Sequence, residues 1–223
     1  MNIWYIKARS LARRLRLHAL FAKVRHAINP HRDREFRVNE WLKGTVKPGD
    51  TVWDVGANVG DYTVELCQWV GPKGRVIAFE PNPDAAAMIT ERLKDCAWIS
   101  IENVALGSRE EEATLAVEPG YTRSGHVMTG GSGIPIQVMT GDAASARLGI
   151  PQLVKIDVEG FEEDVLLGLK DTLRSIQSIV IEVHFHALES RGHAEAPIRI
   201  ERLLKNEGFR LRWVDRSHLV GER

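Results

Sequence analysis

The chain has 223 residues, of which 43% are apolar and 27% are charged, an ordinary balance for a soluble globular protein. Basic and acidic residues number 30 each, so the net charge of zero gives no sign of a nucleic-acid-binding protein. The two cysteines, Cys67 and Cys96, are too few for a disulfide framework, and no apolar run is long enough to predict a transmembrane helix or a secretory signal. We therefore expect a cytoplasmic protein with one domain and a sizeable core.

The first 32 residues carry eight Lys or Arg and no acidic residue, which leaves 22 basic and 30 acidic residues in the rest of the chain. Apolar residues at three- and four-residue spacing predict a helix over residues 5–28; they are Leu11, Leu15, Leu17, Leu20, Phe21, Val24 and Ile28. A second short helix is expected over residues 33–42. We interpret residues 1–44 as a basic helical appendage that packs on the domain or covers its active site. A peripheral membrane contact and an organelle-targeting segment are the alternatives.

From Thr51 onward, short apolar segments alternate with amphipathic ones, which predicts a mostly parallel sheet covered by helices on both faces. The predicted strands are residues 51–55, 75–79, 98–103, 152–157, 178–184 and 209–214. The predicted helices are residues 60–70, 83–94, 161–173 and 195–207. Residues 45–223 are thus expected to form an α/β domain of Rossmann-like fold.

The segment 108–150 interrupts this alternation. Residues 113–118 and 134–139 look like two strands, and the polar, glycine-rich residues between them have no periodicity. We predict a hairpin whose tip is mobile and lies near the site; a solvent loop without a role is the alternative.

Residues 51–63, TVWDVGANVGDYT, combine an apolar strand, a glycine turn and the start of a helix. Glycines let the backbone approach a ligand, and free amides at a helix start favour polar or negative groups. The spacing from Gly56 to Gly60 is G-x-x-x-G, which differs from the G-x-G-x-x-G of dinucleotide-binding folds. Asp54 at the mouth of the loop suits a positively charged ligand, and S-adenosylmethionine carries both an ammonium and a sulfonium group. An ordinary strand–turn–helix is the alternative.

A second acidic residue strengthens the prediction of a nucleoside ligand. The predicted strand 75–79 ends at Glu80, twenty residues after Gly60, and the turn PNP follows. In a βαβ unit, an acidic residue at the tip of the second strand binds ribose hydroxyls.

Five motifs occur in order along the chain: DVGANVGDYT (54–63), FEPNP (79–83), NVALGS (103–108), KIDVEGFEEDVLLG (155–168) and IEVH (181–184). Together they resemble the FkbM-type family of S-adenosylmethionine-dependent methyltransferases. The resemblance covers about three quarters of the chain, from roughly Gly49 to Val214. It implies a class I methyltransferase fold with S-adenosylmethionine as the cofactor.

The resemblance also implies the cofactor-binding residues. The methionine portion would be held by Asp54, Gly56, Ala57, Asn58 and Gly60. Glu80 would bind the ribose, and Asn103 and Ala105 would lie by the adenine ring. The alternative for Asn103 is a side chain that only satisfies a turn.

The catalytic residues would come from the ends of the fourth and fifth predicted strands. In the family, the DVEG corner with Asp157 and Glu159 faces the transferred methyl group, and Asp157 also serves the cofactor. His184 shares the parity of Glu182 and has a pKa range suited to a general base. His186 is the second choice, and a hydrogen-bonded strand end is the structural alternative for His184.

We predict no metal site. Asp157, Glu159, Glu182 and His184 could in principle hold Mg²⁺ or Zn²⁺, but no tight ligand motif such as H-x-x-x-H is present.

The expected activity is O-methylation of a hydroxyl on a small molecule or sugar, without a nucleic-acid partner. An NAD-linked oxidoreductase and a catalytically degenerate, cofactor-binding scaffold are the alternatives. The scaffold alternative rests on the short segment after Val214, which leaves the C-terminal edge of the predicted sheet incomplete unless its last strand is a stub.

Overall fold

A computed structural model describes residues 31–117, 125–128 and 133–223. All of the helix predicted over residues 5–28, and most of the tip of the predicted hairpin, lie outside the described part.

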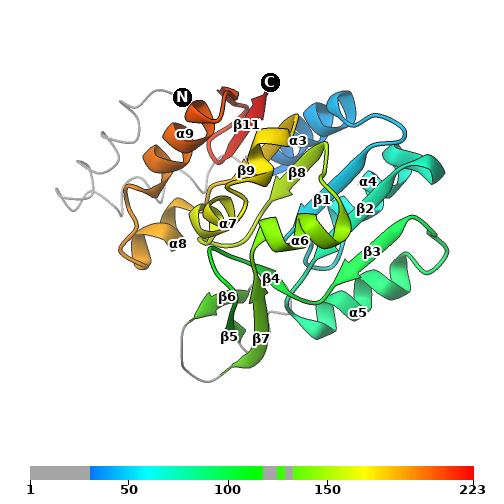
Figure 1. The fold of residues 1–223 in the computed structure, drawn as a ribbon, viewed down its shortest axis with the longest axis horizontal. Helices are drawn as coiled ribbons and strands as arrows, with labels where there is room; N and C mark the ends of the chain where they lie inside the picture. Colours follow the sequence, from blue (N-terminus) through cyan, green and yellow to red (C-terminus); the bar gives the residue numbers. More distant parts are fainter. Residues whose placement is uncertain (1–30, 118–124, 129–132) are drawn as a thin grey trace.

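The domain is built on a seven-stranded sheet (Figure 1). Its strands are β1 Thr51–Val55, β2 Arg75–Phe79, β3 Ile99–Glu102, β8 Leu153–Ile156, β9 Ser178–Glu182, β10 Arg210–Trp213 and β11 His218–Glu222. They lie in the order β10-β11-β9-β8-β1-β2-β3, and the five strands from β9 to β3 are paired in parallel. The predicted Rossmann-like α/β fold is confirmed, with strand ends that differ from the prediction by at most two residues.

The C-terminal edge of this sheet is complete, so the prediction of an incomplete edge was wrong. β11 is a five-residue strand that pairs antiparallel with β10 on one side and β9 on the other. The turn between β10 and β11 is short because Asp215 Oδ1 accepts hydrogen bonds from the backbone amides of Ser217 and His218, 2.7 and 2.9 Å away. A side-chain-stabilised turn of this kind makes room for a full strand in the last residues of the sequence.

The segment after β3 forms a second sheet instead of the predicted two-stranded hairpin. Its strands are β4 Ala105–Leu106, β5 Glu111–Val117, β6 Gly125–Met128 and β7 Ile134–Met139, in the order β4-β7-β5-β6. β5 pairs antiparallel with β6 and with β7, and β4 pairs parallel with β7. The prediction missed β6 because the polar and glycine-rich sequence around it gives no alternating pattern.

Helices cover both faces of the main sheet. They are α3 His31–Thr45, α4 Asp61–Val70, α5 Pro83–Arg92, α6 Gly141–Leu148, α7 Glu162–Gly168, α8 Phe185–Ser190 and α9 Ala196–Asn206, with 3-10 turns at Gly71–Lys73 and Thr172–Ser175. Alternate residues of β1 show why two layers form. Trp53 and Val55 pack in the core beneath α6, α7 and α9, whereas Val52 packs in the core beneath α3 and α4. α6 and α8 were not predicted.

Helix α3 is part of the packed domain, although residues up to 44 were predicted to form an appendage. Val38 and Leu42 are 1% and 0% exposed and belong to the core cluster against β1. The indole of Trp41 donates a hydrogen bond to Glu222 on β11, 2.9 Å away. Residues 31–45 therefore close one face of the sheet.

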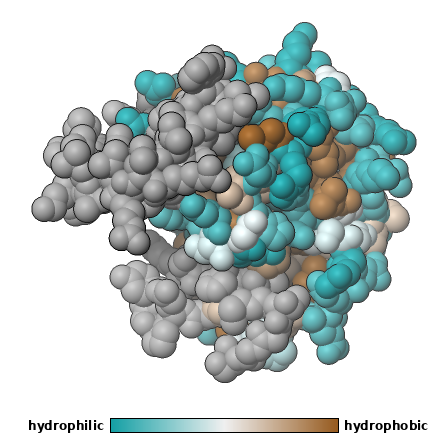
Figure 2. Space-filling view, turned by 90° about the vertical axis from the view of Figure 1, so that its left-hand side faces the viewer, coloured by the Kyte–Doolittle hydropathy of each residue, from teal (hydrophilic) through white to brown (hydrophobic). Residues whose placement is uncertain are grey.

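The described surface is mainly polar. Figure 2 shows hydrophilic residues interspersed with small apolar groups on the described part of one face. Among the described residues, the large apolar side chains with about half of their surface exposed lie apart from one another: Met88 in α5, Leu167 in α7 and Ile150 in a loop. Among the described helices, none is long and apolar enough to cross a membrane.

Candidate active site

The first loop joins β1 to α4 and places backbone amides at the carboxyl end of the sheet. The amides of Gly56 and Ala57 both donate to the Phe79 carbonyl oxygen at the end of β2. Gly56 has φ 79°, and a Cβ there would lie 1.9 Å from the carbonyl oxygen of Asp157. Gly60, with φ 83°, begins α4 and packs against Ile89. Glycine at position 56 thus lets the ends of β1 and β8 approach closely.

Glu80 links this loop to the turn after β2. Its carboxylate is 7% exposed and accepts hydrogen bonds from the backbone amides of Asn58 and Asn82, at 2.7 and 2.8 Å. Burial raises the pKa of Glu80, and the two amide hydrogen bonds oppose that increase. Because each carboxylate oxygen accepts more than one hydrogen bond, Glu80 can hold the loop and also bind a hydroxyl.

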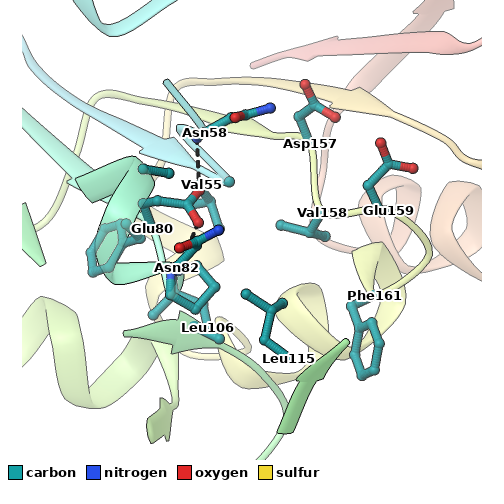
Figure 3. Close-up of a pocket in the computed structure, with 15 residues that line it drawn as sticks. Val55, Asn58, Glu80, Asn82, Leu106, Leu115, Asp157, Val158, Glu159 and Phe161 are labelled. Carbon is teal, nitrogen blue, oxygen red and sulfur yellow. Dashed lines mark hydrogen bonds between the residues drawn. The ribbon is translucent and has the colours of Figure 1, made fainter. Parts of the chain in front are cut away.

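A pocket lies between this loop, the second sheet and the DVEG corner (Figure 3). Its lining residues are Val55, Gly56, Asn58, Phe79, Glu80, Pro81, Asn82, Ala85, Ala105, Leu106, Leu115, Asp157, Val158, Glu159 and Phe161. Glu80 and Asn58 lie on one side, Asp157 and Glu159 on the other, and apolar side chains line the region between. A polar group at each end with an apolar middle fits a nucleoside that carries a charged amino-acid tail.

Four predicted cofactor residues do not line this pocket, and two of them, Asp54 and Asn103, have side chains with other partners. Asp54 is 0% exposed, and its carboxylate accepts a hydrogen bond from Thr63 Oγ1 at 2.7 Å and pairs with Lys155 Nζ at 3.1 Å. Asn103 donates hydrogen bonds to the carbonyl oxygens of Glu80 and Pro81, which is the turn-satisfying alternative. The side chains of Asp54 and Asn103 therefore stabilise the segments around the pocket without lining it. Ala57 and Gly60 shape the loop but are likewise absent from the lining.

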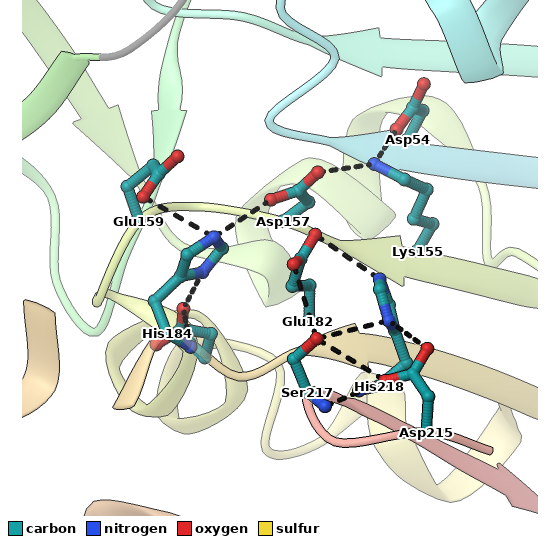
Figure 4. Close-up of polar contacts among 10 residues, drawn as sticks. Asp54, Lys155, Asp157, Glu159, Glu182, His184, Asp215, Ser217 and His218 are labelled. Carbon is teal, nitrogen blue, oxygen red and sulfur yellow. Dashed lines mark hydrogen bonds and ion pairs between the residues drawn. The ribbon is translucent and has the colours of Figure 1, made fainter. Parts of the chain in front are cut away.

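Lys155 is a site residue that the sequence analysis missed. It lies on β8, is 5% exposed, and its ammonium bridges Asp54 at 3.1 Å and Asp157 at 3.4 Å (Figure 4). The ammonium also lies 4.8 Å from the centre of the Tyr62 ring. Burial alone would lower the pKa of Lys155, but the two carboxylates raise it above the usual value. The sequence signal was a lysine in an otherwise apolar central strand.

The DVEG corner after β8 has an uncommon backbone. Glu159 has φ 49° and Gly160 has φ 97°, and left-handed backbone is unusual for a glutamate. This conformation turns the chain from β8 into α7 and places Asp157 and Glu159 at the rim of the pocket. Burial raises the pKa of Glu159, and the nearby His184 opposes this.

His184 lies two residues after β9, at the start of α8, so the predicted continuation of the strand was wrong. Its Nδ1 is 2.7 Å from Glu162 Oε1, and its Nε2 faces Glu159 and Asp157 at 3.4 and 3.6 Å. Glu162 Oε1 also accepts hydrogen bonds from the backbone amides of Gly160 and His184. Glu162 is 0% exposed and was not predicted as a site residue.

The carboxylates around His184 favour its protonated form over the free base that its predicted role requires. Burial alone would lower the pKa of His184, but the hydrogen bond to Glu162 and the carboxylates of Asp157 and Glu159 raise it to about 10. An imidazole surrounded in this way holds its proton at neutral pH until another cation takes that proton's place beside the carboxylates. His186, the second choice, lies within α8.

A further group of polar residues comes from the C-terminal hairpin. His218 Nδ1 is 2.8 Å from Asp215, and its Nε2 is 3.3 Å from Glu182 at the end of β9 (Figure 4). Burial would lower the pKa of His218, but these carboxylates raise it to about 9. Burial would raise the pKa of Glu182, and His218 lowers it to about 2. β11 therefore supplies the partner that keeps Glu182 ionised.

Comparison with known families decides the class of this domain. Residues 54–211 match the methyltransferase FkbM domain, which covers more than half of the chain. The chain belongs to the FkbM methyltransferase family. This confirms the resemblance found in the sequence and identifies a domain of the S-adenosylmethionine-dependent methyltransferase class, which the NAD-linked alternative does not fit.

Two curated relatives agree with this assignment, and one solved structure shares the fold. The chain is 32% identical over 139 residues to the hexuronic acid methyltransferase AglP of Haloferax volcanii, covering 60% of this chain and 56% of AglP. It is 29% identical over 175 residues to the 31-O-demethyl-FK506 methyltransferase FkbM of Streptomyces tacrolimicus, covering 62% and 67%. SMU.1697c of Streptococcus mutans, solved in complex with SAH, shares the fold with TM-score 0.53 and 10% identity, covering 85% of this chain and 97% of that one. The chain thus matches little more than half the length of AglP.

Proposed function

We propose that this chain transfers the methyl group of S-adenosylmethionine to a hydroxyl of a small molecule or a sugar. The observation that carries the proposal is that two carboxylates, Asp157 and Glu159, line the same pocket as Gly56 and Glu80. The names of two relatives, one for a hexuronic acid and one for a 31-O position, support the choice of acceptor.

The pocket gives each part of the cofactor a partner. Glu80 would bind the ribose hydroxyls, and the apolar side chains of Leu106, Leu115 and Phe161 would enclose the adenine ring. The backbone of the first loop, where Gly56 adds no side chain, would approach the methionine portion. S-adenosylmethionine supplies a methyl group on a positively charged sulfur, and this chain must place an acceptor oxygen in line with it.

The DVEG corner would serve the acceptor. A hydroxyl loses its proton when its oxygen takes the methyl group, so a carboxylate within hydrogen-bond distance assists the transfer. Glu159 is the better placed of the two carboxylates, because its side chain is 40% exposed while that of Asp157 is 28% exposed and pairs with Lys155. The complete C-terminal edge also removes the reason for regarding the domain as a degenerate scaffold.

The test is an acceptor screen with labelled methyl donor, using sugars, polyols and phenols, with amines and RNA as competing classes. We expect label in a methyl ether of a hydroxyl acceptor. Glu159→Gln should lower kcat by about 100-fold or more, because general-base assistance contributes about that much. Binding of S-adenosylhomocysteine by this variant should remain.

The matched control is Glu112→Gln, which removes a carboxylate from the exposed side of β5 and should leave kcat unchanged. Transfer only to nitrogen or to RNA would contradict the hydroxyl acceptor. Binding of NAD in place of S-adenosylhomocysteine, measured by calorimetry, would contradict the cofactor.

A further inference from the structure

Three potential metal ligands meet where β8 and β9 end. Asp157 follows β8, Glu182 ends β9 and His184 begins α8, and one ligand atom from each lies within 4.8 Å of the others. Ions such as Mn²⁺, Mg²⁺ or Ca²⁺ form bonds of about 2.0–2.6 Å to oxygen and imidazole ligands, which leaves those ligand atoms about 3–5 Å apart. The three atoms are therefore at a spacing that one ion can bridge.

The His184 ring is held as a ligand would be. Glu162 Oε1 already accepts two backbone amides, so the contact of 2.7 Å with Nδ1 makes that nitrogen the N–H donor. When a metal ion displaces the proton on Nε2, the lone pair left there faces Asp157. A buried carboxylate that orients the distal nitrogen of an imidazole is the usual support of a metal-binding histidine.

Among the described residues, the charged groups at the centre of the cluster are not joined to one another by short hydrogen bonds. Supporting pairs at its edge are short, 2.7 Å for Glu162 with His184 and 2.8 Å for Asp215 with His218. Contacts directed at the centre are longer: 3.6 Å from His184 to Asp157, 3.4 Å from His184 to Glu159, and 3.3 Å from His218 to Glu182. Distances above about 3.2 Å are too long for good hydrogen bonds.

The charges also leave room for a cation. Lys155 forms its shortest ion pair with Asp54, and His218 forms its shortest with Asp215. Longer contacts join the remaining carboxylates to positive groups: Lys155 to Asp157, His184 to Glu159, and His218 to Glu182. A divalent cation that replaced the ring proton of His184 would add a second positive charge among these three carboxylates and reduce their mutual repulsion.

We propose that Asp157, Glu182 and His184 bind one divalent cation of the Mn²⁺ or Mg²⁺ kind beside the methyl-transfer pocket. Three protein ligands leave coordination positions open, and Asp157 lines the pocket, so the acceptor oxygen can reach the ion. The site would then take acceptors whose hydroxyl binds a hard cation. Cation binding itself is independent of the proposed function, whereas the role in holding the acceptor rests on it. The proposal departs from the prediction of no metal made from the sequence.

The test measures Mn²⁺ alone with the full chain, after removal of metals by chelation. Electron paramagnetic resonance reports free Mn²⁺, so the signal lost on adding protein gives stoichiometry and affinity without any activity. We expect about one Mn²⁺ per chain, competed by Mg²⁺. Glu182→Gln and His184→Gln should each weaken binding about ten-fold or more.

Two controls keep the test decisive. Glu112→Gln, in the acidic stretch of β5 on the surface, should bind Mn²⁺ as the unaltered chain does. Each variant is also titrated with S-adenosylhomocysteine, whose retained affinity shows that the fold is intact. No Mn²⁺ binding by the unaltered chain, or equal binding by folded Glu182→Gln and His184→Gln, would overturn the proposal. Mn²⁺ binding without transfer to any hydroxyl would instead reject the proposed function.

Discussion

Asp54 and Glu80 are both buried carboxylates beside the first loop, but their partners give them different tasks. The Asp54 oxygens bond the side chains of Thr63 and Lys155, so this carboxylate stabilises the base of the loop. The Glu80 oxygens accept hydrogen bonds from the backbone amides of Asn58 and Asn82 and border the pocket, so this carboxylate can also contact a ligand. At the residue scale, hydrogen-bond partners distinguish a structural acid from a binding one.

Replacing Glu80 by Gln should weaken binding of S-adenosylhomocysteine about 10- to 100-fold. The variant keeps the shape but loses the charge that the amides of Asn58 and Asn82 bond, and hydrogen bonds to charged groups contribute about 1.5–3 kcal/mol. Isothermal calorimetry measures the change, with Glu112→Gln as the control. An unchanged affinity would mean that Glu80 only supports the loop.

Gly56→Ala should destabilise the protein and weaken cofactor binding together. The new Cβ would lie 1.9 Å from the Asp157 carbonyl oxygen, and the backbone at φ 79° disfavours any side chain, so the ends of β1 and β8 must separate. We expect the free energy of unfolding to fall by more than about 1 kcal/mol in urea denaturation.

Gly44→Ala is the matched control, because a Cβ at this position in α3 meets nothing within 4 Å. Replacing a helical glycine by alanine should raise the free energy of unfolding by about 0.5–1 kcal/mol. Equal effects of the two substitutions would show that the close approach at Gly56 carries no strain.

At the scale of elements, the last strand has two tasks. β11 fills the position between β9 and β10, and it also delivers His218 to Glu182 beside the pocket. The turn at Asp215 fixes the start of β11 and the position of the His218 ring, because the Asp215 carboxylate accepts hydrogen bonds from the turn amides and also contacts that ring. Stability of the sheet edge and geometry of the site are therefore linked through one hairpin.

Leu219→Ala should lower the free energy of unfolding by about 2–5 kcal/mol. Leu219 is 1% exposed and lies opposite Ile181 on β9 and Trp213 on β10, so its removal leaves a cavity in the main core. Urea denaturation tests this, with Arg212→Ala on the exposed side of β10 as the control. A loss below about 0.5 kcal/mol, the usual range for surface positions, would mean that β11 is dispensable for stability.

At the scale of the whole molecule, charge is divided unevenly along the chain. The eight basic residues before residue 33 face a remainder with 22 basic and 30 acidic residues. Opposite charges favour docking of the basic segment on the rest of the chain. Each surface ion pair contributes only about 0–1 kcal/mol, so burial of apolar side chains must supply most of any docking energy. The apolar positions of this segment, such as Leu17, Phe21 and Val24, are the candidates for such burial.

Deleting residues 1–28 should therefore lower the melting temperature. Burying a side chain the size of leucine or phenylalanine stabilises by about 1.5–3 kcal/mol, and several such residues lie in the segment. Thermal unfolding and liposome pelleting are measured side by side. An unchanged melting temperature with loss of salt-sensitive pelleting would identify a membrane contact instead. No change in either would contradict the predicted helix.

The sequence by itself was enough to predict most of the main strands in their order along the chain. It also predicted the cofactor loop and the acidic residues at the ends of strands. These features are local: alternating or continuous apolar runs specify strands, and glycines at 56 and 60 specify the turn. Motif order along the chain was enough to assign the family. The second sheet was predicted only in part, because the residues around β6 show neither the alternating pattern of a strand nor the three- and four-residue spacing of a helix.

Only the tertiary structure decided which charged groups meet. Lys155 and Asp54 are 101 positions apart in sequence, and His184 and Glu162 are 22 apart, so no local pattern pairs them. The protonation of His184 likewise depends on burial and on carboxylates contributed by the DVEG corner and α7. A pKa is set by neighbours in space and by the loss of water around them, and neither is encoded in the residues adjacent along the chain.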